Sequence, residues 1–254
     1  MTFAFVTADA NSNASFEGDT LSLYTSTISS FQSSGGTAIL SFGGYGSSEL
    51  SFNQTNETIL QATYEQFYTT YGVKIWDFDI EGSMAADIPS QDRRNRVLRS
   101  LQKKYSDLEI YFTISISETG LDNTGLSIVN RTKNAGLNVS LVNAMLFDYG
   151  TSNNNNNIND SKAALLALRT QLDKIDKNLK IGATLMIGKD DTGKVMTVQN
   201  TTTLLNWISV NVPSATLISY WAMHRDKPGS NINTNAGITG FTAGDYLKVF
   251  KSYA

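Results

Sequence analysis

Three carboxylates alternate along one short segment of the chain. Residues 74–82 read Lys-Ile-Trp-Asp-Phe-Asp-Ile-Glu-Gly, so Asp77, Asp79 and Glu81 occupy every second position. In a β-strand this spacing puts the three acids on one face, roughly 6–7 Å apart at each step, and the apolar residues on the other. Such a row cannot ionise completely where water is scarce, so at least one acid keeps a proton near neutral pH. A carboxylic acid that stays protonated can serve as a general acid.

Two plainer interpretations of this acid row remain open. The acids could form the water-facing side of an edge strand. They could also bind a hard cation such as Ca²⁺ or Mg²⁺, although no oxygen-rich loop typical of a calcium site flanks them. The bulky residues Trp76, Phe78 and Ile80 and the helical patterns on both sides of the segment favour a strand covered on both faces. We therefore favour a buried acid row.

The elements that position this row follow from the rest of the pattern. The predicted strands are residues 2–8, 37–43, 74–81, 109–117, 141–149, 180–187 and 216–223. Helical periodicity fills the stretches between them, and sustained strand–helix alternation predicts a parallel sheet with helices outside. An eight-stranded β/α barrel typically takes about 250 residues. We therefore predict an α/β fold, a (β/α)8 TIM barrel in a single domain over residues 1–254, with Glu81 at the strand end where barrel enzymes carry their catalytic groups.

Local signals indicate where several helices begin. Asn56 and Ser161 are placed to cap helices, and Pro89 suits a first helical turn. The residues expected on the buried sides of the two capped helices are Ile59, Leu60, Thr63, Phe67, Leu165, Leu168, Leu172 and Ile175. Further helices are predicted over residues 20–33, 124–136, 197–210 and 241–251, and the asparagine run at 153–157 is predicted to be a loop.

The count of strands is one short of a full barrel. Seven strands are visible in the pattern, and the first begins at residue 2. Either one strand escapes the pattern, or the first β/α unit is absent from this chain. In the second case we expect a truncated or rearranged N-terminus, with exposed strand edges at residues 2–8 and 216–223.

The composition excludes several classes of function. Lys plus Arg total 20 and Asp plus Glu total 23, a net charge of −3 that argues against a nucleic-acid or anionic-membrane binder. The chain has no Cys and one His, His224, so thiolate zinc sites, Cys nucleophiles and His-rich metal centres are excluded. Residues 188–194 nearly match a phosphate-binding loop, but Val195 stands where its hydroxyl residue belongs, and we reject that interpretation. We expect no metal.

Four motifs follow one another in the chain, one at each of four predicted strand ends. They are Ser-Phe-Gly-Gly at 41–44, Asp-Phe-Asp-Ile-Glu-Gly at 77–82, Met-Leu-Phe-Asp-Tyr-Gly at 145–150 and Ala-Thr-Leu-Met-Ile-Gly at 183–188. In content and order they resemble glycoside hydrolase family 18, the chitinase family, and within it a bacterial branch. The resemblance runs from about residue 3 to about residue 250. It implies a TIM barrel that hydrolyses β-1,4-linked N-acetylglucosamine.

The resemblance implies a retaining mechanism with substrate assistance. Glu81 would protonate the glycosidic oxygen, and the acetamido oxygen of the substrate would attack the anomeric carbon. Asp79 would orient and stabilise the cyclic oxazolinium intermediate, while Asp77 would share a proton with Asp79. The acids and the substrate acetamide supply the chemistry, so no cofactor is expected.

The same resemblance implies a set of substrate-binding residues. They are Trp221, Tyr149, Asp148, Met145, Tyr45, Ser41, Gly43 and Met186. Trp221 would form an apolar floor beneath the reacting sugar, and Asp148 and Tyr149 would hold its acetamido group. Each has a plainer interpretation: Trp221 as core, Asp148 as a strand-end cap, Tyr45 as part of a loop, and the small residues as packing.

The chain departs from the family pattern at two positions within the motifs. Lys74 stands where the acid motif begins with Asp, at the end of the strand farthest from the site. Phe147 stands where the family has Tyr, which removes a hydroxyl near the acetamido group, and Tyr149 is the candidate to replace it.

We therefore expect an endo-acting chitinase. The alternatives are a non-catalytic chitin- or glycan-binding lectin on the same barrel, and an endo-β-N-acetylglucosaminidase acting on N-glycans. The expected partner is chitin or a chitooligosaccharide, with no nucleic acid and no membrane, and the expected state is a monomer. Secretion is indicated by N-glycosylation sequons at Asn13, Asn53, Asn56, Asn130, Asn138, Asn159 and Asn200.

Overall fold

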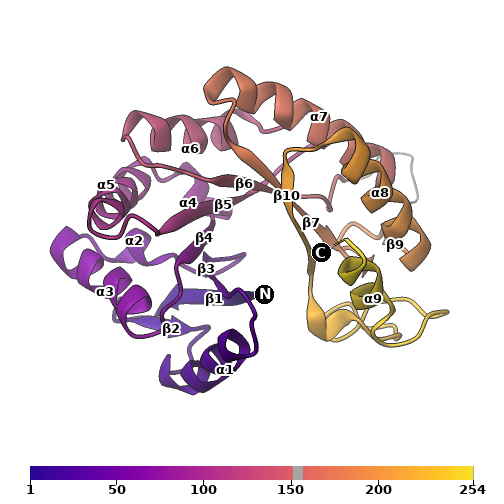
Figure 1. Ribbon diagram of the computed structural model, residues 1–254, viewed down its shortest axis with the longest axis horizontal. Helices are drawn as coiled ribbons and strands as arrows, with labels where there is room; N and C mark the ends of the chain where they lie inside the picture. Colours follow the sequence, from indigo (N-terminus) through magenta and orange to yellow (C-terminus); the bar gives the residue numbers. More distant parts are fainter. Residues whose placement is uncertain (151–156, 254) are drawn as a thin grey trace. The chain divides into compact units, whose positions relative to one another are not determined.

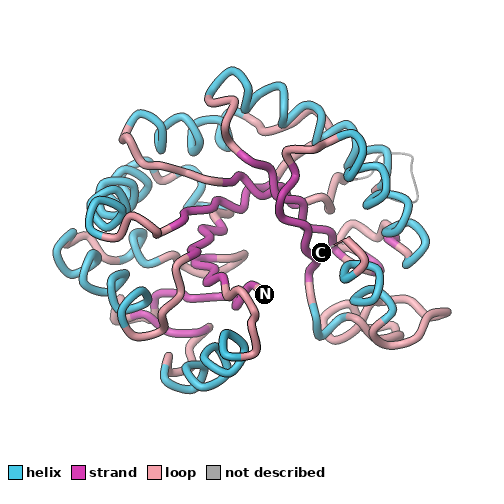
Figure 2. Tube along the Cα trace, viewed as in Figure 1, coloured by secondary structure: helices cyan, strands magenta, loops and turns pink. Residues whose placement is uncertain are grey.

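Strands and helices alternate along the chain in the computed structural model, which describes residues 1–150 and 157–253 (Figures 1 and 2). The chain folds into two compact units. The first contains Met1–Ile114 and Asn123–Leu141, and the second contains Ser115–Asp122 and Val142–Ala254. Most of the predicted asparagine loop lies outside the described residues.

The first unit is a mainly parallel sheet with helices on its outer side. Its strands follow the order β2-β1-β3-β4-β5, in which only β2 runs antiparallel to its neighbour. The strands are β1 (Thr2–Ala8), β2 (Ala14–Phe16), β3 (Ile39–Gly43), β4 (Ile75–Asp79) and β5 (Glu109–Ser115). The helices are α1 (Ser22–Ser33), α2 (Leu50–Asn53), α3 (Glu57–Thr69), α4 (Gly82–Ala86), α5 (Ile88–Lys104) and α6 (Asn123–Asn134). Figure 1 shows α1, α3 and α5 on the outer side of these strands.

The edge of β1 is covered, where the sequence predicted an exposed edge. The short strand β2 pairs with the last three residues of β1, from Val6 opposite Phe16 to Ala8 opposite Ala14. This pairing satisfies backbone groups that an open edge would leave to water. The expectation of a bare edge along residues 2–8 is therefore wrong for the second half of the strand.

The core of the first unit is aromatic. Phe42 of β3 stacks on Phe78 of β4 at 5.1 Å between ring centroids, and Tyr64 and Phe67 of α3 pack edge-on against Phe42. Trp76 and Phe78 are fully buried on the helix-facing side of β4. The predicted alternation of apolar and acidic positions is therefore confirmed, and it fixes the direction in which the acids point.

The second unit repeats the same architecture. Its parallel strands follow the order β6-β7-β10, and β8 and β9 form a separate two-stranded hairpin. The strands are β6 (Leu141–Met145), β7 (Lys180–Met186), β8 (Gly188–Lys189), β9 (Val195–Met196) and β10 (Ala215–Trp221). The helices are α7 (Ile158–Ile175), α8 (Val198–Asn211), the 3₁₀ turn η1 (Met223–Arg225) and α9 (Asp245–Lys251). The segment that nearly spells a phosphate-binding loop forms this hairpin.

The predicted helix starts are confirmed in two cases and wrong in one. Asn56 caps α3 by accepting bonds from the amides of Thr58 and Ile59, and Pro89 lies in the first turn of α5. Helix α7 instead begins at Ile158 with Asn157 at its N-cap, so Ser161 lies inside the helix. The low-complexity asparagines before it obscure the true start, because each of them is an acceptable cap.

One residue predicted to be buried is exposed. Ile59 of α3 is 51% exposed, whereas Leu60, Tyr64 and Phe67 are fully buried. The latter three follow a spacing of four and three residues, which defines a single stripe on the helix. Ile59 lies one residue, about 100°, away from that stripe.

All seven predicted parallel strands are confirmed. None of the helices in the described part of the chain is both long and apolar enough to cross a membrane.

Candidate active site

The acid row lies on the inner face of β4, away from the helices. Asp77 is 7% exposed and Asp79 is 6% exposed, so the interpretation as a water-facing edge is wrong for these two acids. Strand β4 runs between β3 and β5, with Ser41 opposite Asp77 on one side and Thr113 opposite Asp79 on the other. The structure thus brings Ser41 and the two aspartates together.

Asp77 is held by two hydroxyl groups. Ser41 donates to Asp77 Oδ2 over 2.7 Å, and Thr113 donates to Asp77 Oδ1 over 2.8 Å. Burial raises the pKa of Asp77 to about 6, and the two hydroxyl bonds oppose that rise because they favour the charged form. Asp77 is therefore a buried acid that titrates close to neutral pH.

Asp79 stands between two other acids. Burial raises its pKa well above the usual range, and the charges of Glu81 and Asp77 and a hydrogen bond to Glu81 raise it further. Its Oδ1 atom is buried and has no hydrogen-bond partner within the described residues. Each of these causes favours the protonated form of Asp79 over the charged form.

Glu81 lies immediately beyond the strand. It occupies the N-cap position of α4 with an extended backbone, φ −125° and ψ 166°, and its side chain is partly exposed. The extended backbone continues the alternation of β4, so Glu81 follows Asp79 on the same face. A partly exposed acid beside a buried one can exchange a proton with both a substrate and its neighbour.

The end of β3 packs closely against the acid strand. Gly43 has a φ of +106°, and a Cβ atom there would lie 2.2 Å from the backbone oxygen of Asp79. The amide of Gly44 donates to that same oxygen over 3.0 Å. Gly43 is thus required for the close approach of the two strands. Tyr45, two residues on, is 85% exposed.

Three predicted binding residues end the strands of the second unit. Met145 is the last residue of β6, Met186 of β7 and Trp221 of β10, and Trp221 pairs in register with Met186. Both methionines are buried, and Trp221 is half-buried. The indole packs edge-on against the ring of His224 at 6.4 Å between centroids.

Asp148 and Tyr149 lie in the segment after β6. Asp148 is exposed, and its Oδ1 accepts a bond from the amide of Asp191 over 3.0 Å. Desolvation and the charges of Asp190 and Asp191 raise the pKa of Asp148 to about 6. The Tyr149 hydroxyl lies 3.4 Å from Ser161 Oγ, and burial raises its pKa.

Sequence reasoning missed two polar features. Thr113 completes the environment of Asp77, and its polar type at an alternate position of β5 was the available signal. In the second unit, a chain of hydrogen bonds crosses three neighbouring strands. It joins Asn143 of β6 to Thr184 of β7 over 2.8 Å, and Thr184 to Ser219 of β10 over 2.6 Å.

The described residues contain no group of three or more His, Cys, Asp or Glu side chains arranged to hold a metal ion. Chemically, the row of Asp77, Asp79 and Glu81 offers one partly exposed acid, one buried acid whose pKa is raised well above the usual range, and one buried acid held by hydroxyl groups.

Sequence comparison finds relatives that are chitinases. The chain is 28% identical over 224 residues to a probable bifunctional chitinase/lysozyme of Escherichia coli, a match that covers 80% of this chain and 25% of the relative. It is 27% identical over 225 residues to endochitinase 11 of Metarhizium anisopliae, which covers 81% of this chain and 43% of the relative. The chain thus spans less than half the length of either curated relative. No model of a protein family matches it.

Structural comparison identifies the fold. The catalytic domain of a hyperthermophilic chitinase from Pyrococcus furiosus matches with a TM-score of 0.85 and 22% identity, covering all of this chain and 86% of that one. A family 18 chitinase from Pseudoalteromonas aurantia matches with a TM-score of 0.65 and 14% identity, covering all of this chain and 91% of that one. The fold is the TIM barrel of chitinase catalytic domains, as predicted. Together with the sequence relatives, it confirms the resemblance to glycoside hydrolase family 18 chitinases.

Proposed function

We propose that the chain is an endo-acting chitinase that hydrolyses β-1,4-linked N-acetylglucosamine with retention of configuration and with assistance from the substrate acetamide. The observation that carries this proposal is the acid row, in which the buried Asp79 lies between Asp77 and Glu81, is hydrogen-bonded to Glu81 and has its pKa raised by burial and by the charges of both neighbours. The chitinase relatives in sequence and the chitinase fold support the same conclusion.

Each of the three acids has its own role in the proposed proton transfer. Glu81, the partly exposed member, gives its proton to the glycosidic oxygen as the bond to the leaving sugar breaks. The acetamido oxygen of the substrate attacks the anomeric carbon, so the protein needs no nucleophile of its own. Through their hydrogen bond, Asp79 stabilises the carboxylate that Glu81 becomes after it has given up its proton. Asp79 also orients the acetamide of the substrate. Asp77 has both oxygens bonded to hydroxyl groups, so we assign the shared proton of Asp79 to its bond with Glu81 rather than to Asp77.

We propose that residues at the ends of β6, β7 and β10 contact the substrate. Trp221 offers an apolar ring face for a sugar, and Met145 and Met186 end the neighbouring strands. Asp148 and Tyr149 are assigned to the acetamido group. Of the first unit, Tyr45 is assigned to a sugar because its ring is exposed, while Ser41 and Gly43 serve the site by holding Asp77 and the backbone of Asp79.

The experiment that tests the proposal measures release of a fluorophore from a chitotriose conjugate. Glu81→Gln keeps the shape of the side chain and removes the acid, so we expect the rate to fall by about 10²–10⁴-fold while binding of chitotriose persists. Glu57→Gln is the matched control, because Glu57 is an exposed residue of α3 paired with Arg96. It should keep the wild-type rate.

The outcome separates this proposal from the alternatives. A folded wild type that binds chitotriose without cleaving it would be a lectin. Cleavage of the chitobiose core of N-glycans in preference to chitooligosaccharides would instead make the chain an endo-β-N-acetylglucosaminidase. Equal rates for wild type and Glu81→Gln would contradict the assignment of the acid.

Three further measurements test the finer points of the mechanism. Proton NMR of the products at early times should show the β-anomer first, because substrate assistance retains configuration. A substrate whose reacting sugar lacks the acetyl group should not be cleaved. Chitohexaose should yield internal cleavage products from the start if action is endo.

We also propose that the chain is a monomer and that it acts outside the cell, where polymeric chitin is found. The exposed sequon residues Asn13, Asn53 and Asn130 are accessible to a glycosyltransferase, which supports passage through a secretory route. Mass spectrometry of the protein from its native source would test this directly, since each occupied sequon adds the mass of a glycan.

A further inference from the structure

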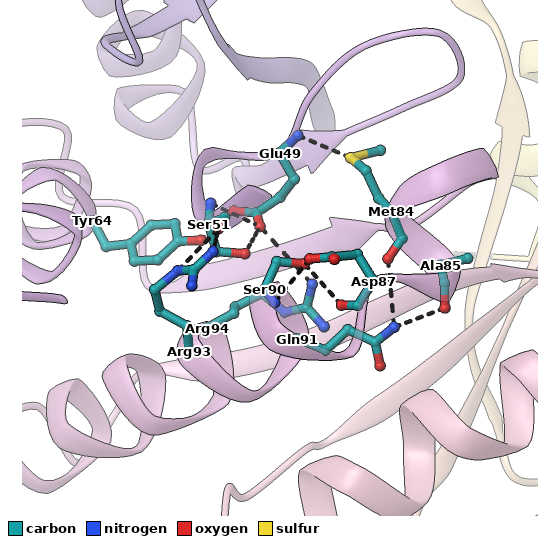
Figure 3. Close-up of polar contacts among 10 residues, drawn as sticks. All are labelled: Glu49, Ser51, Tyr64, Met84, Ala85, Asp87, Ser90, Gln91, Arg93 and Arg94. Carbon is teal, nitrogen blue, oxygen red and sulfur yellow. Dashed lines mark hydrogen bonds and ion pairs between the residues drawn. The ribbon is translucent and has the colours of Figure 1, made fainter. Parts of the chain in front are cut away.

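A buried polar network connects helix α4 to its neighbours. Its members come from the segment that leads into α2, from α3, and from the helices α4 and α5, all in the first unit (Figure 3). The proposed mechanism uses none of these side chains. One of them, Gln91, reaches the short helix that begins directly after Glu81.

Gln91 binds the carboxyl end of α4. Its Nε2 donates to the backbone oxygen of Ala85 over 2.7 Å and to that of Met84 at 3.4 Å. Figure 3 shows the Gln91 amide directed at these two carbonyl groups. Helix α4 spans only Gly82–Ala86, so most of its carbonyl groups have no partner within the helix. Gln91 supplies a donor to the carbonyl of Ala85 and a second, longer contact to that of Met84, which also accepts from the amide of Asp87 over 3.3 Å.

The residue that supplies this donor is itself fixed. Gln91 is 1% exposed and belongs to the first turns of α5, where Asp87 accepts a bond from the amide of Ser90 over 2.9 Å. Three residues on, Arg94 lies over the rings of Phe112 and Phe78 at 4.9 and 5.5 Å. Helix α5 is therefore attached to the back of the acid strand itself.

A second contact holds α4 from the opposite direction. The backbone amide of Glu49 points at Met84 Sδ over 3.0 Å, and Met84 is buried. Glu49 is in turn held by Tyr64 and Ser51, and by Arg94 at 3.9 Å. Helix α4 thus has fixed contacts at its carboxyl end, and Glu81 stands at its N-cap.

From this arrangement we propose that Gln91 is a positioning residue for Glu81 and acts through α4. The inference rests on the proposed function of Glu81 as the acid. Only the NH₂ group of the Gln91 side chain is used, since its buried Oε1 has no partner within the described residues. Glu81 is the N-cap of a five-residue helix, so the position of its carboxyl group depends on the position of that helix. A displacement of the acid by about 1 Å can cost about 10²-fold in rate.

The test compares two substrates in Gln91→Met, a variant that keeps the shape of the side chain and removes the donor. In chitotetraose the leaving group is a hydroxyl group of the next sugar, and this group needs a proton from the acid. A dinitrophenyl chitobioside has a leaving group that departs as a stable anion. We expect kcat on chitotetraose to fall by about 10- to 100-fold with little change in KM, while the aryl substrate loses less than about 3-fold.

The chain offers a matched control on the same helix. Gln102 of α5 also donates from Nε2 to two backbone carbonyl groups, those of Leu108 over 3.1 Å and Asn138 over 2.8 Å, away from α4. Gln102→Met removes this pair of bonds and also the bond that Gln102 Oε1 accepts from the amide of Asn138 over 3.0 Å. It should reduce the rates on both substrates equally or not at all. Equal losses on the two substrates in Gln91→Met would overturn the proposal, because a general loss of folded enzyme has that effect.

A measurement that needs no activity completes the test. Amide hydrogen exchange over residues 82–87 should speed up by about 10-fold or more in Gln91→Met and remain unchanged in Gln102→Met. The pH titration of the Glu81 carboxyl carbon should shift in the first variant only. If the wild type cleaves neither substrate, the proposed function fails, and these two readouts still decide whether Gln91 fixes α4. If amide exchange over residues 82–87 and the titration of Glu81 are both unchanged in Gln91→Met, the proposal that Gln91 positions Glu81 is refuted.

Discussion

At the scale of single residues, the acid row shows what spacing in a sequence can and cannot predict. The alternation of Asp77, Asp79 and Glu81 with bulky apolar residues predicted a strand with the acids on one face, and the structure confirms this for the strand itself. The partners of the acids were not predictable to the same degree. Thr113 is 36 positions away from Asp77, and only the pairing of β4 with β5 brings their side chains together.

The hydroxyl group of Thr113 lowers the pKa of Asp77, so its removal should raise that pKa. Thr113→Val keeps the shape of the side chain and leaves Asp77 Oδ1 without its donor. A hydrogen bond to a charged group contributes about 1.5–3 kcal/mol, which corresponds to a rise of about one to two pKa units. The measurement is the pH titration of the Asp77 carboxyl carbon by NMR, assigned with Asp77→Asn.

Thr132→Val provides the control for that titration. Thr132 is also a buried threonine of the first unit, but its hydroxyl donates to the backbone oxygen of Val129 within α6. The Asp77 titration should be unchanged in this variant. A pKa of Asp77 that falls in Thr113→Val, or stays at about 6, would show that the Thr113 hydroxyl does not stabilise the charged carboxylate.

At the scale of elements, the fold was largely predictable because each strand and helix carries its own periodic signal. The seven parallel strands, the cap at Asn56 and the first helical turn at Pro89 follow from local patterns. The elements that were missed depend on other parts of the chain. Strand β2 has only three residues, and it is a strand because β1 offers an unpaired edge. The start of α7 was obscured by neighbouring asparagines with equal capping ability.

The turn after β3 allows a prediction about two glycines that differ in their surroundings. Gly43 has a φ of +106°, and an added Cβ would lie 2.2 Å from the backbone oxygen of Asp79. Gly46 has a φ of +74°, and an added Cβ would meet nothing within 4 Å. Gly46→Ala should therefore cost about 1 kcal/mol from its backbone conformation alone, and Gly43→Ala clearly more, because strands β3 and β4 must also separate.

Thermal unfolding of both variants checks this prediction, and the rate on the chitotriose conjugate adds a second readout. Gly43→Ala should lower activity as well as stability, because the clash falls on the backbone of Asp79. Gly46→Ala should lower stability only. Comparable unfolding temperatures in the two variants would mean that the close approach at Gly43 does not contribute to the positioning of the acid strand.

At the scale of the whole molecule, the buried acids make stability depend on pH in an unusual direction. Burial raises the pKa of Asp77 from 3.8 in the unfolded chain to about 6 in the folded one. The folded state therefore binds more protons than the unfolded state between about pH 4 and pH 6, so the free energy of unfolding falls as pH rises through that window. Asp79, whose pKa is also raised, acts in the same direction. Two acids that serve the proposed chemistry thus destabilise the fold at neutral pH.

Asp77→Asn should accordingly stabilise the protein at pH 7–8 and leave it almost unchanged at pH 4. A difference of about two pKa units corresponds to roughly 3 kcal/mol at most, so a gain of about 1–3 kcal/mol in the free energy of unfolding is expected above pH 6. Asp107→Asn should behave in the opposite way, because the pKa of the exposed Asp107 is lowered by Lys74 and its stabilising effect is present only above the unfolded pKa. Denaturant unfolding from pH 4 to pH 8 measures both. If Asp77→Asn were less stable than wild type at pH 8, the hydroxyl bonds of Ser41 and Thr113 would have to outweigh the cost of burying the charge, and the acid row would be a source of stability.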